Sequence, residues 1–480
     1  MKLAEILAVF GLEAFENAAR TGESARVEPS GYSIDSRTLR EGDLFLAIKG
    51  EIHDGHQYVA DVLAKGAIAA VVQRTFDAGP KIDPARLIRV DDTLAALQRL
   101  ASSVLKSWRG EEIAITGSMG KTTTKEMTAA TLSRVGRVVK TAGNLNNEYG
   151  LPLSVMQMES GGAHASEFDF AVLEMGMNHS GEIERLAKIA PPDVAVVTVV
   201  APVHLEFFSS IDEIAAAKSE IVLGTRSGGA VVLNADDERV AGMRRLRADV
   251  EYRTFGIERK ADVSARSLES DGVSSTSFDL VTLRGEAACT LAAAGRHSVY
   301  NALAAAAVGD YYGILPEEIA RALSAAPLPK MRGEVLRFVE GFTVIDDSYN
   351  SNPKALIEMI RTIGMSREAS RRIVIAGEML ELGVAGPELH YQAGREIASS
   401  GVDLLIGVRG LAAEMIEGAR EAGMAEGAAR FCETPEAAAE LIKREVRAGD
   451  LVLVKGSRGV RIERVVNRLR ESFEQRRREG

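Results

Sequence analysis

Short, almost unbroken runs of apolar residues recur along the middle of this chain, and each is followed by a polar turn and a helical stretch. The clearest runs are FAVLEMGM (170–177) and DVAVVTVV (193–200), and GGAVVLNADDE (228–238) contains another. A strand that is apolar on both faces has to be buried on both faces, which is typical of a parallel sheet covered by helices. The sequence therefore predicts an α/β fold with mostly parallel sheets.

Two stretches of turn-forming residues divide the chain. The charged turn RGEE (109–112) follows a helix predicted over 93–108, and the proline-containing APLPKMRGE (326–334) follows the alanine-rich middle part. A chain of 480 residues is too long for one ordinary hydrophobic core. In the last part, strands are expected over 342–348, 372–379, 402–410 and 451–457. We predict three domains: an N-terminal α/β domain (1–108), a central domain with a mostly parallel sheet (109–327) and a doubly wound, Rossmann-like C-terminal domain (328–480).

Composition narrows the class of protein. The net charge of −10 gives no overall attraction to nucleic acid or to an anionic membrane. The two cysteines, Cys289 and Cys432, lack the spacing of a zinc site or a disulfide scaffold, which fits a reducing cytosol. No apolar run is long enough to cross a membrane, and the amphipathic start (1–15) is typical of a helix rather than a signal peptide. We therefore expect a cytoplasmic protein without a membrane span.

The stretch AITGSMGKTTTKEM (114–127) has the properties of a phosphate-binding loop. The general pattern requires a glycine where this chain has Ile115, so the loop does not match it. A buried strand nevertheless runs into a turn with Gly117 and Gly120, and Lys121 then begins a threonine-rich helix that we expect to be closed by a glycine C-cap at Gly136. Backbone N–H groups and a helix N-terminus bind anions in such a turn. The alternative is an ordinary glycine-rich turn with a surface lysine.

Three polar residues follow the loop in otherwise apolar segments. Glu174 ends a run expected to be a buried strand, where its carboxylate either meets Mg²⁺ or faces solvent. His204 follows the next buried run, and a lone histidine is more often structural than a ligand. Lys218 lies in an alanine-rich helix, where a lysine most simply extends its ammonium to solvent. The residues alone leave these alternatives open.

Two polar loops stand out as well. TAGNLNNEYGLP (141–152) contains three asparagines, and DDSYNSNPKAL (346–356) places two acids at the end of an expected strand. Each loop either hydrogen-bonds a ligand or simply makes a turn.

A series of segments, taken in order, resembles the Mur ligase family. The short loop form TGxxGKT of that family matches residues 116–122, and the N-terminal segment 33–59 is similar to its UDP-sugar domain. DDSYNSNP and GEMLELG point to the member that adds D-alanyl-D-alanine, since we find no DNPR-type motif of the diaminopimelate-adding sibling. The segments that carry the resemblance are TGSMGKTTTKEM, GNLNNEYGLPLSVM, EMGMNHSGEI, HLEFFSSIDEIAAAKSEI, NADDE, GRHSVYNALAAAA, DDSYNSNPKAL, GEMLELG and VKGSRG.

The resemblance implies an enzyme that uses ATP and Mg²⁺ to join D-alanyl-D-alanine to UDP-N-acetylmuramoyl-tripeptide through an acyl phosphate. The product would be the UDP-muramoyl-pentapeptide precursor of peptidoglycan, and we expect the enzyme to be a monomer. One alternative is another ligase of the superfamily, either a sibling amino-acid-adding enzyme or a folylpolyglutamate synthetase. A non-catalytic nucleotide-binding switch is a further alternative, but it leaves Glu174, His204 and Lys218 without a shared purpose.

The resemblance also implies roles for individual residues. Asn301 would contact adenine, Asp347 ribose and Arg332 the γ-phosphate, the last two from a C-terminal domain that closes. The expected ATP contacts are Gly117, Ser118, Gly120, Lys121, Thr122, Thr123, Asn301, Arg332 and Asp347. The expected Mg²⁺ ligands are Thr122, Glu174, His204 and a carbamylated Lys218, and the expected catalytic residues are Lys121, His204, Lys218 and Arg332. Expected substrate contacts are Asp35, Ser36, Arg37, His56, Asn144 and Asn147, with Asn350, Asn352 and Ser457 for D-alanyl-D-alanine.

Three positions depart from the family pattern. Pro202 stands close before His204, Ser298 replaces an asparagine on the expected adenine side, and Glu378 replaces an aspartate in GEMLELG. None of these changes removes a group that the implied mechanism requires.

Overall fold

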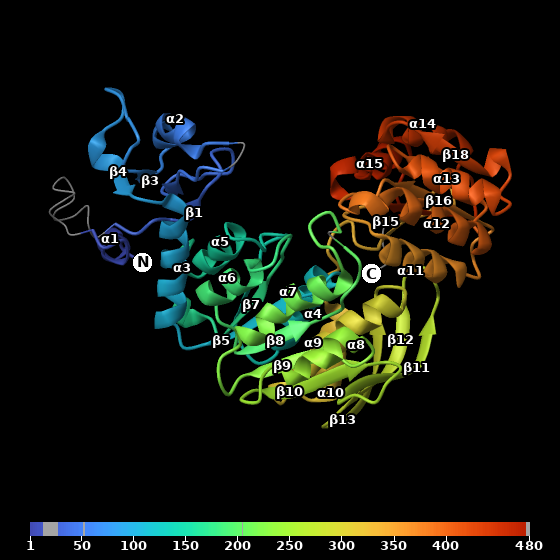
Figure 1. Ribbon diagram of the computed structural model, residues 1–480, viewed down its shortest axis with the longest axis horizontal. Coiled ribbons are helices and arrows are strands. Elements are labelled where there is room, and N and C mark those ends of the chain that lie inside the picture. Colours follow the sequence, from blue (N-terminus) through green and yellow to red (C-terminus); the bar gives the residue numbers. More distant parts are fainter. Residues whose placement is uncertain (13–26, 51–52, 204, 477–480) are drawn as a thin grey trace.

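The computed structural model describes residues 1–12, 27–50, 53–203 and 205–476, which form three sheets with helices packed on them. The N-terminal and C-terminal units lie on the same side of the central one, at opposite ends of it (Figure 1). The predicted α/β architecture with mostly parallel sheets is confirmed. No helix in the described ranges combines the length and the apolar character that crossing a membrane requires.

The N-terminal sheet is parallel and small. Its strands lie side by side in chain order, β1 (Tyr32–Ser33), β2 (Leu44–Leu46), β3 (Ala69–Gln73) and β4 (Leu87–Val90). Strand β2 covers only three residues of the stretch DLFLAIKG (43–50). The helices of this unit are α1 (Leu3–Val9), α2 (Val59–Ala64) and α3 (Thr93–Ser107).

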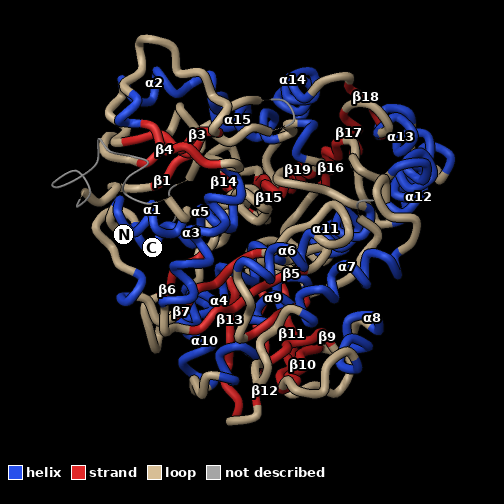
Figure 2. The backbone as a smooth tube through the Cα atoms, turned by 60° about the vertical axis from the view of Figure 1, so that its left-hand side comes forward, coloured by secondary structure: helices blue, strands red, loops and turns tan. Residues whose placement is uncertain are grey.

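Helix α3 joins the N-terminal unit to the central one. Asp92 caps the helix by accepting hydrogen bonds from the N–H groups of Leu94 and Ala95. Leu97 and Leu100 belong to one hydrophobic cluster that contains residues of both units. At the end of the helix, the indole N–H of Trp108 donates to the carbonyl of Phe168 at 2.7 Å. The two units therefore share a continuous core along α3. Figure 2 shows the path of α3 between the two units.

The central sheet, formed by described residues between 111 and 291, has nine strands. Its order is β13-β12-β11-β10-β9-β8-β5-β7-β6, parallel from β6 to β11 and antiparallel from β11 to β13. The strands are β5 (Glu111–Thr116), β6 (Val138–Lys140), β7 (Phe170–Glu174), β8 (Val194–Val197), β9 (Ala230–Asn234), β10 (Glu251–Gly256), β11 (Val263–Ser270), β12 (Thr276–Thr282) and β13 (Gly285–Leu291). The helices are α4 (Lys121–Leu132), α5 (Gly150–Met156), α6 (Glu182–Ile189), α7 (Ile211–Leu223), α8 (Glu238–Gly242), α9 (Arg296–Tyr311) and α10 (Pro316–Ala325).

The central strands are buried on both faces, as their unbroken apolar pattern predicts. In β5, Ala114 belongs to the cluster that contains α6 and α7, whereas Ile113 and Ile115 belong to the cluster that contains α4, α9 and α10. The antiparallel strands β11 to β13 are an addition that the prediction lacked. Their signal is weaker, because β12 alternates buried and partly exposed residues instead of forming an apolar run.

The end of α4 differs from the prediction. The helix begins at Lys121 as predicted, and Gly120, with a left-handed φ of 82°, is its N-cap. It ends at Leu132, and Gly136 has no positive φ, so this glycine is not a C-cap. A Cβ at position 136 would lie 2.8 Å from atoms of Asp169 and Phe170, so Gly136 allows a close approach of β7 instead.

The C-terminal sheet has the order β14-β15-β19-β16-β17-β18 among the described residues and is parallel apart from β14. Asp347 and Lys455 lie at the carboxyl ends of the adjacent strands β15 and β19, where ligands of such sheets bind. The strands are β14 (Glu334–Arg337), β15 (Thr343–Asp347), β16 (Arg371–Gly377), β17 (Leu404–Val408), β18 (Ala429–Cys432) and β19 (Asp450–Lys455). The helices are α11 (Pro353–Gly364), α12 (Gly386–Ser399), α13 (Ala412–Glu421), α14 (Pro435–Glu445) and α15 (Glu463–Ser472).

The turn between β11 and β12 connects the central unit to the C-terminal unit. Val273 belongs to the hydrophobic cluster of the C-terminal unit, and Arg337 donates to the hydroxyl of Ser274 at 3.2 Å. Gly272 has a φ of 74°, and a Cβ there would lie 2.5 Å from the backbone nitrogen of Ser366. This contact holds the end of α11 against the central unit.

Candidate active site

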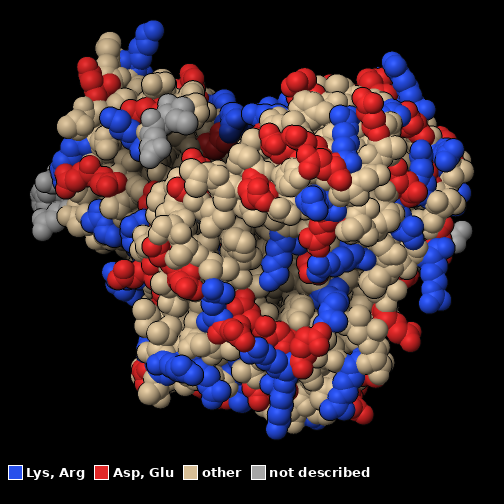
Figure 3. All heavy atoms as spheres, turned by 45° about the vertical axis from the view of Figure 1, so that its right-hand side comes forward, with Lys and Arg blue, Asp and Glu red and all other residues tan. Residues whose placement is uncertain are grey.

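A cavity of about 1000 Å³ lies between the central and C-terminal units. Its walls include Lys121 and Glu174 from the central unit and Asp347, Asn350 and Ser457 from the C-terminal unit. The space-filling view shows a hollow near the middle of the molecule, with Lys and Arg side chains around it (Figure 3). Segments singled out in the central and C-terminal parts of the sequence therefore meet around one cavity.

The loop from 117 to 120 is packed too tightly for side chains at its two glycines. Gly117 and Gly120 have φ angles of 150° and 82°. A Cβ at 117 would lie 1.9 Å from the hydroxyl of Thr198, and one at 120 would lie 2.2 Å from Oδ1 of Asn301. The Thr198 hydroxyl also donates to the carbonyl of Met119 at 2.6 Å. The loop is thus held between the end of β8 and helix α9, whatever residue stands at 115.

The first residues of this loop and its helix have the arrangement expected of an anion site. Ser118 accepts from the N–H of Ala201 at 2.9 Å and donates to its carbonyl at 3.1 Å, which fixes the loop. Lys121 donates to the carbonyl of Gly117 at 2.8 Å. Burial lowers the pKa of Lys121; the Glu174 carboxylate opposes this shift and the Arg332 guanidinium adds to it. Two cations held near the free N–H groups at the start of α4 suit the oxygens of a polyphosphate.

Glu174 is held at the cavity by both of its carboxylate oxygens. The side chain is 2% exposed at the end of β7. Thr122 donates to Oε2 at 2.9 Å, and Asn146 donates to Oε1 at 2.8 Å. A hydroxyl and a carboxylate are the donor types that Mg²⁺ prefers, alongside phosphate and water. The predicted pair Thr122 and Glu174 is therefore brought together in a way that fits this ion.

The prediction missed Asn146 and chose two other asparagines of the same loop. Asn144 lines the cavity, but Asn147 accepts from the N–H of Gly150 at 3.0 Å at the start of α5. The cluster of asparagines was the available signal. Only the path of the loop determines which amide faces Glu174.

Lys218 is buried in α7 with 2% exposure, so the interpretation as a lysine that extends to solvent is wrong. Burial lowers the pKa of Lys218 well below its usual value, and the nearby Lys121 ammonium lowers it further. Neutral lysine is the form that reacts with carbon dioxide. His204 lies outside the described residues, and the described ranges contain no group of three or more His, Cys, Asp and Glu side chains placed to hold a metal.

The predicted nucleotide contacts lie on both sides of the cavity. Oδ1 of Asn301 accepts from Thr124 at 3.3 Å and so contacts the helix that follows the phosphate loop. Asp347 accepts from the ammonium of Lys455 at 2.6 Å. The guanidinium of Arg332 stacks over the ring of Tyr349 at 4.1 Å. Contacts of these residues with adenine, ribose and γ-phosphate stay predictions.

The three residues expected to bind D-alanyl-D-alanine all line the cavity, but their side chains also hold the local backbone. Asn350 accepts from the N–H of Ser351 at 2.9 Å, and Asn352 caps α11. Ser457 accepts from the N–H of Leu380 at 2.9 Å. Direct binding by these side chains stays a prediction.

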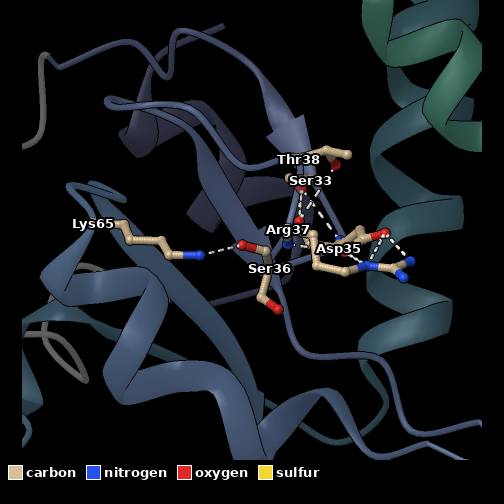
Figure 4. A network of polar contacts seen from close by, with 6 residues as sticks. All are labelled: Ser33, Asp35, Ser36, Arg37, Thr38 and Lys65. Atoms are coloured by element: carbon tan, nitrogen blue, oxygen red, sulfur yellow. Dashed lines mark hydrogen bonds and ion pairs between the residues drawn. The ribbon is translucent and has the colours of Figure 1, made fainter.

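The N-terminal motif forms a network of its own, away from the cavity lining (Figure 4). Arg37 donates to both oxygens of Asp35, which lowers the pKa of that carboxyl to about 2. The carbonyl of Ser36 accepts from Lys65 at 2.8 Å, while its hydroxyl points away from the network. His56 is buried. Its Nδ1 lies 2.6 Å from Oδ1 of Asp54, and its Nε2 accepts from the N–H of Gln73 at 2.9 Å.

Both ring nitrogens of His56 are therefore engaged within the fold, and the ring positions β3. Its expected contact with the UDP-sugar stays a prediction. Arg37 is exposed beside its ion pair with Asp35, and its expected contact with the UDP-sugar also stays a prediction.

Family models match three consecutive parts of the chain. They are described as Mur ligase family, catalytic domain, over residues 28–104; Mur ligase middle domain, over 115–309; and Mur ligase, glutamate ligase domain, over 331–458.

Relatives with one shared name match nearly the whole chain. The UDP-N-acetylmuramoyl-tripeptide–D-alanyl-D-alanine ligase of Bacillus subtilis is 34% identical, covering 92% of this chain and 93% of its own length. The protein of the same name from Mycobacterium tuberculosis is 37% identical, covering 88% of this chain and 89% of its own length.

Solved structures agree with these matches. A structure of MurF from Acinetobacter baumannii has a TM-score of 0.83 at 30% identity, covering 98% of each chain. MurF of Thermotoga maritima, solved in complex with ADP, has a TM-score of 0.78 at 28% identity, covering 93% of this chain and 97% of its own. A folylpolyglutamate synthase from Mycobacterium tuberculosis has a TM-score of 0.62 at 17% identity, covering 78% of this chain and 93% of its own, which indicates a shared fold alone.

Proposed function

The chain belongs to the Mur ligase family, and from this we propose that it is the ligase that adds D-alanyl-D-alanine to UDP-N-acetylmuramoyl-tripeptide. ATP is converted to ADP and phosphate, and the product is the UDP-muramoyl-pentapeptide. The observation that carries the proposal is the match over nearly the full length of both chains to relatives of this name. A folylpolyglutamate synthetase or a sibling ligase is the alternative, and the match to a solved folylpolyglutamate synthase indicates the fold alone.

The reaction has two chemical steps. The terminal carboxylate of the tripeptide attacks the γ-phosphorus of ATP, which gives an acyl phosphate and ADP. The amine of D-alanyl-D-alanine then attacks the acyl carbon, and the tetrahedral intermediate expels phosphate as the amide forms. Phosphoryl transfer depends mainly on positioning and on neutralising charge.

The phosphate loop supplies both requirements. We assign Lys121 to the β- and γ-phosphate oxygens, because its ammonium lies at the loop beside Glu174 and within the field of Arg332. Arg332 enters from the C-terminal unit, so the second cation is in place only when the two units are together. Their approach also excludes water from the acyl phosphate.

Mg²⁺ would be held by Thr122 and Glu174, whose oxygens lie 2.9 Å apart, and when bound it adds positive charge beside the γ-phosphate. His204 and Lys218 are proposed as ligands of a second ion. Lys218 would serve as a carbamate: its neutral amine adds carbon dioxide, releases a proton and becomes an anion. Its burial supports this, since an ammonium in the same place would repel the ion.

The assignment of one ligand to each of the three units is also a proposal. Residues 1–108 would bind the UDP-sugar through Asp35, Ser36 and Arg37, residues 109–327 would bind ATP, and residues 328–480 would bind D-alanyl-D-alanine. That the enzyme is a cytoplasmic monomer stays a prediction, and a mass measured in solution tests the oligomeric state.

The decisive experiment measures phosphate release with each substrate omitted in turn. Release should require ATP, the UDP-linked tripeptide and D-alanyl-D-alanine together. Running the assay with tripeptides that contain lysine or diaminopimelate identifies the third residue that the enzyme accepts. Release that is independent of either acceptor would show that the proposed function is wrong.

A further inference from the structure

Lys125 is a fully buried lysine that the reaction does not use. It lies one helical turn after Lys121 in α4, and its side chain is 0% exposed. Its ammonium has three partners: the carbonyl of Thr141 at 2.7 Å, the carbonyl of Gly143 at 3.3 Å and the carboxylate of Glu126 at 3.0 Å. Burying a cation is unfavourable unless its donors are satisfied, and here all three are.

Two of these partners belong to the asparagine loop, residues 141–147. The loop contains two local backbone hydrogen bonds. The N–H of Leu145 donates to the carbonyl of Ala142, and the N–H of Asn146 donates to the carbonyl of Asn144. Such local bonds shape a loop but do not attach it to the rest of the protein. The N–H of Thr141 attaches the start of the loop to β7 by donating to the carbonyl of Val172 at 3.1 Å, and the ammonium of Lys125 attaches the loop backbone to the helix of the phosphate site.

The loop in turn holds Glu174. The Thr141 hydroxyl accepts from the N–H of Glu174 at 2.9 Å, and the Asn146 amide donates to Oε1 at 2.8 Å. The carbonyl of Asn146 accepts from the N–H of Gly176 at 2.8 Å, and a Cβ at 176 would lie 2.9 Å from the Asn146 amide. A shift of the loop would thus remove one of the two side-chain partners of the Glu174 carboxylate.

We propose that Lys125 is a positioning residue, which fixes the asparagine loop so that Asn146 keeps the Glu174 carboxylate turned toward Thr122. The effect on the loop belongs to the free protein. The expected effect on Mg²⁺ rests on the proposed function, because it assigns Glu174 to that ion. Groups that orient a metal ligand typically change metal affinity about 10–100-fold when removed.

The test compares Lys125→Met, Asn146→Ala and the double variant. Lys140→Met is the matched control, because Lys140 also pairs with Glu126 but is 41% exposed and contacts neither loop carbonyl. Hydrogen exchange of the free proteins should show the amides of Leu145 and Asn146 exchanging about tenfold faster in Lys125→Met than in wild type. Lys140→Met should exchange as wild type does.

The second measurement is the Mg²⁺ concentration that gives half-maximal phosphate release. It should rise about tenfold in Lys125→Met and in Asn146→Ala, and no further in the double variant, because both changes remove the same contact. If Lys125 has only a structural role, the increases in Mg²⁺ concentration caused by the two substitutions should multiply in the double variant, and the loop amides of Lys125→Met should exchange no faster relative to other segments than in wild type. Either result would overturn the proposal.

A wild-type measurement keeps the proposal testable if Lys125→Met does not fold. The loop amides of the free protein should exchange at least about tenfold more slowly than in an unfolded chain, and exchange at the unfolded rate would overturn the proposal. Failure of the proposed function is distinguishable from this, because it abolishes substrate-dependent phosphate release in wild type and leaves the exchange measurements intact.

Discussion

Replacing Glu112 by glutamine should flatten the pH dependence of stability in the central sheet. Glu112 is the second residue of β5, its side chain is fully buried, and neither carboxylate oxygen has a hydrogen-bond partner in the described part of the chain. Burial raises the pKa of this carboxyl from 4.5 to about 8, an effect that Arg226 opposes and Asp193 strengthens. The buried side chain is therefore neutral over much of the working pH range.

The sign of this pH dependence follows from whether the folded or the unfolded chain binds the proton. Between the unfolded and folded pKa values, the folded chain keeps a proton that the unfolded chain has released. The contribution to stability is present below about pH 4.5 and is lost as the pH rises through the folded pKa of about 8. Each pKa unit corresponds to about 1.4 kcal/mol, so the free energy of unfolding should fall by about 4 kcal/mol between about pH 5 and about pH 9.

The side chain at position 112 is neutral at every pH in Glu112→Gln. The free energy of unfolding of this variant, measured relative to that of wild type, should therefore rise by about 4 kcal/mol over the same interval. Urea unfolding followed by the fluorescence of Trp108, the single tryptophan, measures this, because its indole packs against Gly110 beside β5. Glu286→Gln, at an exposed position of β13, is the control and should follow wild type. The reasoning would be refuted if the free energy of unfolding of Glu112→Gln and of wild type depended on pH in the same way. It would also be refuted if the difference between the two shrank as the pH rose.

Three further predictions concern the site. Lys121→Ala should lower kcat about 10²-fold or more, because it removes a preorganised charge at the phosphates, and a near-wild-type rate of phosphate release would contradict that role. Lys218→Ala should nearly abolish ligation, and wild-type activity should fall when carbon dioxide is removed from the buffer; an unchanged turnover would exclude the carbamate. Gly120→Ala should lose ADP affinity measured by calorimetry, since its φ is 82° and its Cβ would lie 2.2 Å from Asn301. Gly161→Ala, with a φ of 66° and open space around it, is the control for backbone strain, and equal affinities in both variants would show that the contact with Asn301 is unimportant.

The sequence predicted those features that depend on local pattern. The apolar runs of β5, β7 and β8 indicated strands buried on both faces, and the structure confirms this with a hydrophobic cluster on either face. Glycines at 117 and 120 indicated a tight anion-binding turn, and no side chain fits at either position. Because strand ends of a parallel sheet meet at one edge, the proximity of Glu174 to this turn was also predictable.

The features that the sequence left open depend on segments far apart in the chain. Three asparagines in one loop are equivalent by pattern, and only the packing of that loop against β7 brings Asn146, rather than Asn144 or Asn147, to Glu174. Lys218 reads as a surface lysine within its helix, and only the elements around α7 bury it.

Sequence alone thus determined the α/β fold class, the phosphate loop and, through the resemblance, the family. Tertiary structure decided which polar side chains face the cavity and which serve the fold, as the engaged ring of His56 illustrates. The physical reason is that apolar periodicity and the backbone freedom of glycine are properties of short segments, whereas a hydrogen bond or a desolvated charge requires a partner supplied by another part of the chain.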